Sequence, residues 1–388
     1  MSFNQFTNLD FASLRSQIKD YLRVNSDFAD FDFEGSNFST LIDLLAYNSY
    51  ITAYNTNMAV NECFLDSATL RENVVSLARN IGYVPRSSRS AQAVVNFSVD
   101  LGTNDTKIVT LKAGQVALGV QQGSSYIFSI PDDFVATSGT NNIATFDNLK
   151  IYEGIYLEKT FQIDYSQPNQ RFILPNANID TTSIRVTVTS TTSEIYTLYD
   201  NILRVDAESK LFLIQEIEDE HYEILFGDGI LGKKPPSGAI VNVSYIVSNG
   251  RAGNDAKNFS FIGILEDDRA LSITSGISVI QTANKASMGD DIEDISSIKY
   301  LAPRIYSSQY RAVTASDYSG IIPFVYPNVE SVTAYGGEEL DPPEFGKVFI
   351  SIKPKNGSFL SQITKDDISR QLKQYSIAGI KPEIIDLK

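Results

Sequence analysis

The sequence predicts an α+β protein of several parts: an N-terminal helical region, a central and mostly antiparallel β region, and a small C-terminal α/β sandwich. Two observations predict this class. Apolar residues recur every three or four positions over the first ninety residues, and from about Ala91 they alternate with polar ones. The length, 388 residues, is also more than one domain usually holds. We therefore divide the chain into residues 1–90, 91–288 and 289–388.

The N-terminal region contains three predicted helices. The first carries a stripe from Phe11 to Leu22 and begins after a cap at Asn8 or Asp10. The second begins at Ser36 or Asn37. The third begins near residues 66–67 and ends before Gly82 and Pro85, which are typical helix stop signals.

The second helix is apolar around more than half of its circumference, over residues 38–54. A helix with so much apolar surface needs its own bundle or the helices of a partner. The extended segment before it, 30–34, alternates carboxylates with phenylalanines that would dock into a groove. The candidate partner-interface residues are Phe31, Phe33, Phe38, Leu41, Leu45, Tyr50 and Tyr54.

The central region reads as short strands separated by polar turns. Residues 95–99 and 184–188 alternate apolar and polar side chains, and no helical stretch is expected before about residue 290. Such strands favour antiparallel sheets in a sandwich or an open barrel. A glycine-dependent loop is expected between strands at 222–226 and 239–247.

The last hundred residues mix both periods. A helix over 292–301 follows an acidic run, and Thr314 with Asp317 resembles a capping box that opens a second helix, which should end near Pro323. Strands at 329–335 and 347–353, a helix at 364–375 and a strand at 382–387 follow. This order predicts a small sheet with helices on one face.

The composition limits the classes of function. The net charge of −15 argues against nucleic-acid binding, which needs clustered cations. No apolar run is long enough to cross a membrane, and the first residues do not resemble a secretion signal. The lone Cys63 cannot form an internal disulfide, which fits a reducing compartment.

Four features resemble catalytic or ligand sites, and each has a stronger structural interpretation. Residues 227–234 match a phosphate-binding loop except at Lys234, where Ser or Thr is required. Residues 30–35 begin like a calcium loop, but its twelfth position is Leu41 instead of Glu. His221 has no nucleophile near it in sequence, and Cys63 reads as a small buried residue. We therefore predict no catalytic, cofactor or metal site.

Three segments together resemble a known family. Residues 226–238 (FGDGILGKKPPSG), followed by 241–245 and 250–254, resemble the core motif of the baseplate J-like family of contractile-tail proteins. Residues 311–318, 335–337 and 346–354 resemble its C-terminal α/β part, and residues 31–47, 64–71 and 81–86 are similar to the helical region of the baseplate wedge subunit of T-even-like phages. The loop-motif residues are Phe226, Gly227, Asp228, Gly229, Gly232, Pro235, Gly238, Gly250, Gly253 and Asn254.

The resemblance implies a non-enzymatic structural subunit of a phage-tail baseplate wedge, assembled in the host cytoplasm and located in the virion. Its implied partners are a second copy, another wedge protein bound through the N-terminal helices, and sheath-initiating and hub-proximal baseplate proteins. The wedges would form a ring around the central hub and transmit the trigger for sheath contraction. Two alternatives stay open: a tail-associated hydrolase of glycan or peptidoglycan, which would need a suitably spaced carboxylate pair, and a receptor-binding protein at the tail periphery.

Overall fold

The helices and sheets of this chain fall into two units in the computed structural model, which describes residues 10–25, 36–102, 107–139, 141–167, 169–199, 205–282, 284–326, 328–355, 359–360 and 362–386. The first unit contains residues 1–84 and 295–306, and the second contains residues 85–294 and 307–388. The chain therefore passes between the two units three times, after Val84, Asp294 and Tyr306.

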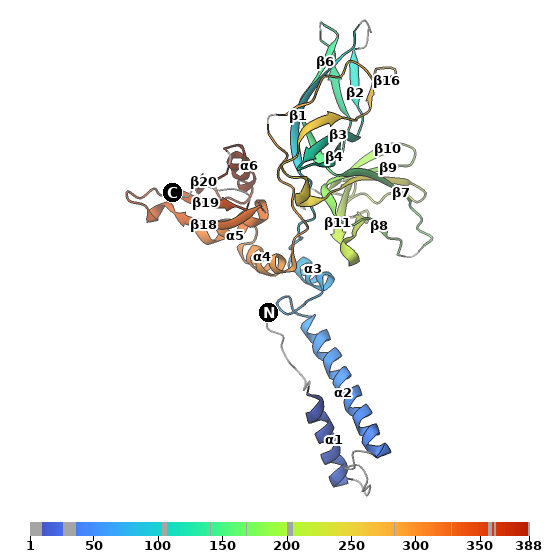
Figure 1. Cartoon of the computed structure of the whole chain (residues 1–388), viewed down its shortest axis with the longest axis vertical. Coiled ribbons are helices and arrows are strands. Elements are labelled where there is room, and N and C mark those ends of the chain that lie inside the picture. The colour runs from blue at the N-terminus through green and yellow to red at the C-terminus, as the bar shows by residue number, and fades with distance from the viewer. Residues whose placement is uncertain are drawn as a thin grey trace. The chain divides into compact units, whose positions relative to one another are not determined.

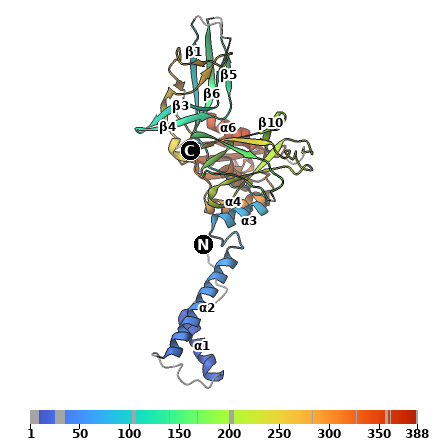
Figure 2. The same ribbon diagram turned by 90° about the vertical axis from the view of Figure 1, so that its right-hand side faces the viewer.

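The first unit is helical. Its helices are α1 (Phe11–Asn25), α2 (Asn37–Asn61), α3 (Arg71–Asn80) and most of α4 (Ile295–Ser308). The α1 helix lies alongside α2 (Figures 1 and 2). The carboxylate of Asp10 accepts a hydrogen bond from the Ser13 N–H at 2.9 Å, so Asp10 caps α1 as one of the two predicted residues.

One side of α2 packs against α1. Ser36 caps α2, with its hydroxyl accepting from the Ser39 N–H at 3.0 Å. Ile42 and Ala46 are buried, and Arg15 of α1 forms an ion pair with Asp43 of α2. The predicted start of the helix is thus confirmed. On this side of α2, its apolar side chains are also buried, as the sequence predicts.

Two predictions for the next segment are wrong. The α3 helix begins at Arg71, and not near residues 66–67, because the Glu62 carboxylate binds the Thr69 N–H at 2.7 Å and the Thr69 hydroxyl at 2.6 Å. That bond holds the preceding residues in a turn. Cys63 lies in this turn and is exposed, so it does not have the buried position that we expected.

The second unit begins with two sheets that share one apolar core. A six-stranded sheet has the order β14-β3-β4-β6-β1-β17 and a four-stranded sheet has the order β16-β15-β2-β5. Figure 2 shows β1, β5 and β6 side by side. The strands are β1 (Gln92–Asp100), β2 (Ile108–Leu111), β3 (Gly114–Gln121), β4 (Ser124–Ile130), β5 (Phe134–Thr137), β6 (Ile143–Glu153), β14 (Lys257–Phe261), β15 (Leu265–Glu266), β16 (Ser272–Ile273) and β17 (Gln281–Thr282).

A seven-stranded sheet holds a second core, built from inward-facing residues such as Val186, Val188 and Val243. Its order is β7-β13-β9-β10-β11-β12-β8, and every neighbouring pair is antiparallel except β10 with β11. The predicted antiparallel β region is confirmed. The strands are β7 (Ile155–Gln162), β8 (Phe172–Leu174), β9 (Ile179–Thr189), β10 (Ser193–Leu198), β11 (Leu211–Glu216), β12 (Tyr222–Phe226) and β13 (Ile240–Val247).

The C-terminal part is the predicted small α/β structure. Its sheet has the order β18-β19-β20, and α5 and α6 contact each other as well as the sheet. The capping box is present: the Asp317 N–H donates to the Thr314 hydroxyl at 3.2 Å, and the Thr314 N–H donates to the Asp317 carboxylate at 2.9 Å. The elements are α5 (Ala315–Val325), β18 (Val329–Gly336), β19 (Lys347–Pro354), α6 (Gln362–Leu372) and β20 (Lys381–Ile385).

The two helices that flank residue 310 are longer than predicted. The α4 helix extends to Ser308, and α5 continues two residues past Pro323, because the Tyr326 N–H still donates to the Ile322 carbonyl at 2.7 Å. Among the described helices, none is both long enough and apolar enough to span a membrane.

Candidate assembly surfaces

The α2 helix keeps a wide apolar surface on the sides that α1 does not cover. Leu41, Leu44 and Leu45 are each more than half exposed, with exposed fractions of 53%, 62% and 55%. Large apolar side chains grouped on one element in this way are a mark of an interaction surface. The exposed apolar residues of α2 are Leu41, Leu44, Leu45, Tyr47, Ile51 and Tyr54, which we call the α2 apolar face.

The predicted interface residues divide into three groups. Leu41, Leu45 and Tyr54 belong to the α2 apolar face. Phe38 and Tyr50 are half-buried, so they serve the packing of the unit as well as any partner. The other two, with the segment that resembles a calcium loop, lie outside the described residues: Phe31 and Phe33.

The glycine-rich loop joins β12 to β13 as the sequence predicts. The Asp228 carboxylate accepts the N–H groups of Ile230 at 2.8 Å and Leu231 at 2.9 Å. These backbone hydrogen bonds, that from Leu231 first, lower the pKa of Asp228 below its ordinary value. The carboxylate therefore organises this turn.

Gly227 and Gly232 let the two ends of the turn touch. A side chain on Gly227 would overlap the backbone of Gly232 and Leu231, and Gly232 has a φ of +87°. At the loop exit, the carbonyl of Pro235 accepts the Tyr165 hydroxyl at 2.6 Å, and the Gly238 N–H donates to the carbonyl of residue 163 at 2.7 Å. The loop is thus a braced structural turn.

The turn presents two apolar side chains to solvent. Ile230 is 76% exposed and Leu231 is 55% exposed, while Gly229 and its N–H bond to the Gly232 carbonyl keep the tip closed. Phe226, at the start of the loop, is half-buried and packs edge-on against Phe172 and Tyr196.

The second half of the motif, residues 250–254, has a different structural role, which the sequence did not predict. Gly253 lies against the side chain of Glu153, and Asn254 exchanges two hydrogen bonds with Gly289 at 2.8 and 2.9 Å. Gly250 lies against residues 290–291. These residues hold the chain where it leaves the second unit toward α4.

Buried carboxylates lie at this place. Glu153 accepts the Ser248 hydroxyl at 2.9 Å, the Asn249 side-chain amide at 2.7 Å and the Asn249 N–H at 3.1 Å. Burial raises the pKa of Glu153, and the bonds from Asn249 and Ser248 only partly oppose this.

Asp290 is 4% exposed and binds two guanidinium groups. Its carboxylate accepts Arg86 Nη2 at 2.8 Å and Arg251 Nε at 2.5 Å, and Glu293 accepts the Arg86 N–H at 2.9 Å. No local sequence pattern marks these acids as buried, because Asp and Glu occur throughout the chain. We call Arg86, Arg251, Asp290 and Glu293 the junction cluster.

These groups are bound to one another and to the backbone around them. Each buried carboxylate is already bound by donors, and in the described ranges no group of three or more His, Cys, Asp or Glu side chains is placed to hold a metal ion. His221 lies in a turn between β11 and β12, with its ring nitrogens 3.3 Å from the carbonyls of Glu218 and Pro175. The arrangement suits packing and assembly.

Three family models match the chain in succession. The helical domain of gp6-like baseplate wedge proteins matches residues 10–83, the third domain of the bacteriophage baseplate wedge protein gp6 matches residues 159–250, and C-terminal domain I of the baseplate structural protein gp6 matches residues 314–385. These ranges correspond to α1–α3, to the seven-stranded sheet and to the C-terminal α/β part.

Among curated proteins, the baseplate wedge protein gp6 of Enterobacteria phage T4 is 29% identical over 98% of this chain. The chain spans 59% of the length of that relative. Among solved structures, the anti-feeding prophage baseplate aligns with 14% identity and a TM-score of 0.34, over 99% of this chain and 80% of that one. The TssK-TssF-TssG baseplate subcomplex of a type VI secretion system aligns with 8% identity and a TM-score of 0.38, over 88% and 96%. Three successive parts of the chain, and its sequence over nearly its whole length, are thus similar to gp6-like baseplate wedge proteins.

Proposed function

We propose that this protein is a structural subunit of the baseplate wedge in a contractile phage tail, and that it is located in the virion. The observation that carries the proposal is the succession of three gp6 domain matches, in chain order, each on its own part of the fold. The identity with the T4 wedge protein over nearly the whole chain supports it further.

We further propose that the α2 apolar face is where the subunit meets its partners. Leu41, Leu44 and Leu45 are exposed although they lie on a helix that already packs against α1. Burying such side chains would favour association by roughly 25 cal/mol per Å² of apolar area before the costs of ordering are counted. The expected occupants are the N-terminal helices of a second copy and of another wedge protein.

Contacts with sheath-initiating and hub-proximal baseplate proteins, closure into a ring and transmission of the contraction trigger are parts of the same proposal. Repeated contacts around a ring would supply avidity even where each one is weak. We propose no enzymatic role. The two alternatives, a hydrolase and a receptor-binding protein, rank behind the wedge subunit. We keep residues 1–90, 91–288 and 289–388 as the proposed division into domains.

The test compares two charge substitutions. Leu45→Asp places a charge on the α2 apolar face, whereas Thr191→Asp places the same charge in the exposed turn between β9 and β10. Each variant is expressed alone and together with the neighbouring tail proteins of its genome, and the mass of each species is measured by light scattering after size exclusion. We expect Leu45→Asp to lose the complexes and Thr191→Asp to keep them.

Circular dichroism in the β region must stay unchanged in both variants, which shows that the sheets are intact. Complexes of the same mass with Leu45→Asp would contradict the assignment of the α2 apolar face. A wild-type chain that stays monomeric with all of its neighbours would contradict the wedge function itself, and a glycan-cleavage screen would then test the hydrolase.

A further inference from the structure

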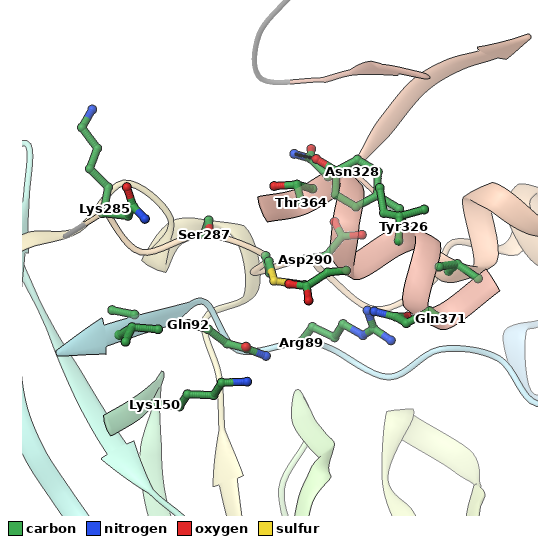
Figure 3. A pocket seen from close by; sticks show the side chains of 17 residues that line it. Arg89, Gln92, Lys150, Lys285, Ser287, Asp290, Tyr326, Asn328, Thr364 and Gln371 are labelled. Carbon is green, nitrogen blue, oxygen red and sulfur yellow. Dashed lines mark hydrogen bonds between the residues drawn. The ribbon is translucent and has the colours of Figure 1, made fainter. Parts of the chain in front are cut away.

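The second unit contains a cavity of about 410 Å³ beside the start of β1. Figure 3 shows Gln92 and Lys150 reaching into it from the paired strands β1 and β6, with Arg89 beside Gln371 of α6. Small-ligand sites commonly have a volume of roughly 300–1,000 Å³, so this cavity is large enough for an anionic group and its neighbouring atoms.

The backbone positions Arg89 at this cavity. The Arg89 N–H donates to the Asp290 carbonyl at 2.8 Å, and the Asp290 N–H donates to the Arg89 carbonyl at 3.1 Å. The side chain is partly buried. Burial first, and then the charge of Arg86, lowers the pKa of the Arg89 guanidinium, and the charges of Asp180 and Asp290 only partly oppose this. A partly desolvated cation of this kind gains much from a bound anion.

The carboxylates at the cavity already have partners. Asp290 binds Arg86 and Arg251, and Asp367 pairs with Arg370 at 3.2 Å. In the adjoining hollow, Asp180 accepts the Ser90 N–H at 2.9 Å and the Thr182 hydroxyl at 2.7 Å. Two lining cations are left whose side chains have no ion pair or hydrogen bond within the described part of the chain: Arg89 and Lys150.

The rest of the lining supplies neutral hydrogen-bond donors. Side-chain amides and hydroxyls surround the two cations, and the carboxylates facing the space are engaged. Such a wall is notable on a chain with a net charge of −15, because most of its surface would repel an anion. The donor side chains are those of Gln92, Asn284, Ser287, Tyr326, Asn328, Thr364 and Gln371.

We propose that this cavity binds an oxyanion, a carboxylate or a phosphate group, held between Arg89 and Lys150. The planar guanidinium of Arg89 can donate two parallel hydrogen bonds to such a group, and the ammonium of Lys150 adds a second positive charge. The site is separate from the α2 apolar face, so its occupancy and the wedge function can be tested independently.

The test is calorimetric titration of the full chain at low salt with two probes, inorganic phosphate and acetylated tetraglutamate. Arg89→Gln and Lys150→Gln are expected to weaken binding at least about tenfold, the effect of losing one charged hydrogen bond. Lys257→Gln, an exposed lysine on β14 away from the cavity lining, is the matched control and should bind like the wild type.

The two probes distinguish the source of the anion. Binding of phosphate alone identifies a free-anion site, and binding of the peptide identifies an acidic segment of another protein; either result supports the proposal when Lys150→Gln reduces it. Lys150 is exposed, so its variant keeps the test valid if Arg89→Gln lowers the melting temperature. No binding of either probe to the wild type, or equal binding by Lys150→Gln and Lys257→Gln, would overturn it.

Discussion

Glu153, Asp290 and Glu293 are acids with at most 4% of their surface exposed, in a chain whose other acids mostly face water. A buried carboxylate is costly unless donors surround it. Ser248 and Asn249 supply these donors for Glu153, and Arg86 and Arg251 supply them for Asp290. Of these two carboxylates, only Asp290 is paired with cations.

Glu153 should make stability fall as the pH rises. Its pKa is raised in the folded state, so its contribution is complete below the pKa of an unfolded Glu, about 4.3, and is lost as the pH rises through the folded value. Urea denaturation at several pH values from 4 to 8 measures this. We expect Glu153→Gln to have a flatter pH profile than the wild type, whatever its absolute stability; parallel profiles would disprove the assignment.

Gly227→Ala should damage the loop between β12 and β13. The added methyl group would overlap the backbone of Gly232, so the turn must open, at a cost of roughly 2–4 kcal/mol. Gly238→Ala is the matched control: its φ is +83° but open space surrounds it, so only about 1 kcal/mol of backbone strain is expected. Thermal denaturation compares the two variants. Equal losses would mean that close approach at Gly227 is unimportant.

At the scale of single elements, the capping box of α5 gives the simplest test. Thr314→Ala removes the oxygen that accepts the Asp317 N–H and should cost about 1 kcal/mol. Thr314→Ser keeps that oxygen and should stay within a few tenths of the wild type. Hydrogen exchange of the first turn of α5 measures the local effect. The same loss in both variants would show that the methyl group of Thr314 matters and the cap does not.

Local signals explain which elements could be predicted. Apolar spacing and the caps Asp10, Ser36 and Thr314 located three helices to within a few residues, because a cap depends on neighbours in sequence. The start of α3 was missed because the carboxylate of Glu62 reaches forward to Thr69, a contact that periodicity does not contain. The helical turn after Pro323 was missed because proline removes one N–H bond and leaves the bond from Tyr326 intact.

The candidate sites follow the same division. The apolar pattern predicted that α2 has more apolar surface than its own neighbours cover. The glycines predicted the tight loop between β12 and β13. The junction cluster could not be predicted, since Arg86 and Asp290 are separated by 204 positions and nothing local marks either one as buried. Exposure of Cys63 likewise depends on the turn that Glu62 holds, and not on the apolar residues beside it.

At the scale of the whole molecule, the junction cluster joins the segments that enter and leave the second unit. Asp290→Asn removes the charge between two guanidinium groups; since Arg251 is half exposed, we expect a loss of about 2–4 kcal/mol instead of the full effect of a buried pair. Asp294→Asn, at an exposed position, is the control. Urea denaturation followed in the β region measures both. A urea midpoint for Asp290→Asn equal to that of the wild type would show that the junction cluster does not contribute to stability.

The three passages of the chain between the units have a practical consequence for dissecting the protein. A protease that cuts after Val84 alone would not release the whole helical unit. Residues 295–306, which belong to that unit, would stay covalently attached to the second unit at both of their ends. A chimera that exchanges only the first 84 residues with those of a relative would pair foreign helices with the native α4. Swaps should therefore carry residues 295–306 with the N-terminal helices, so that both pieces of one folding unit come from the same parent.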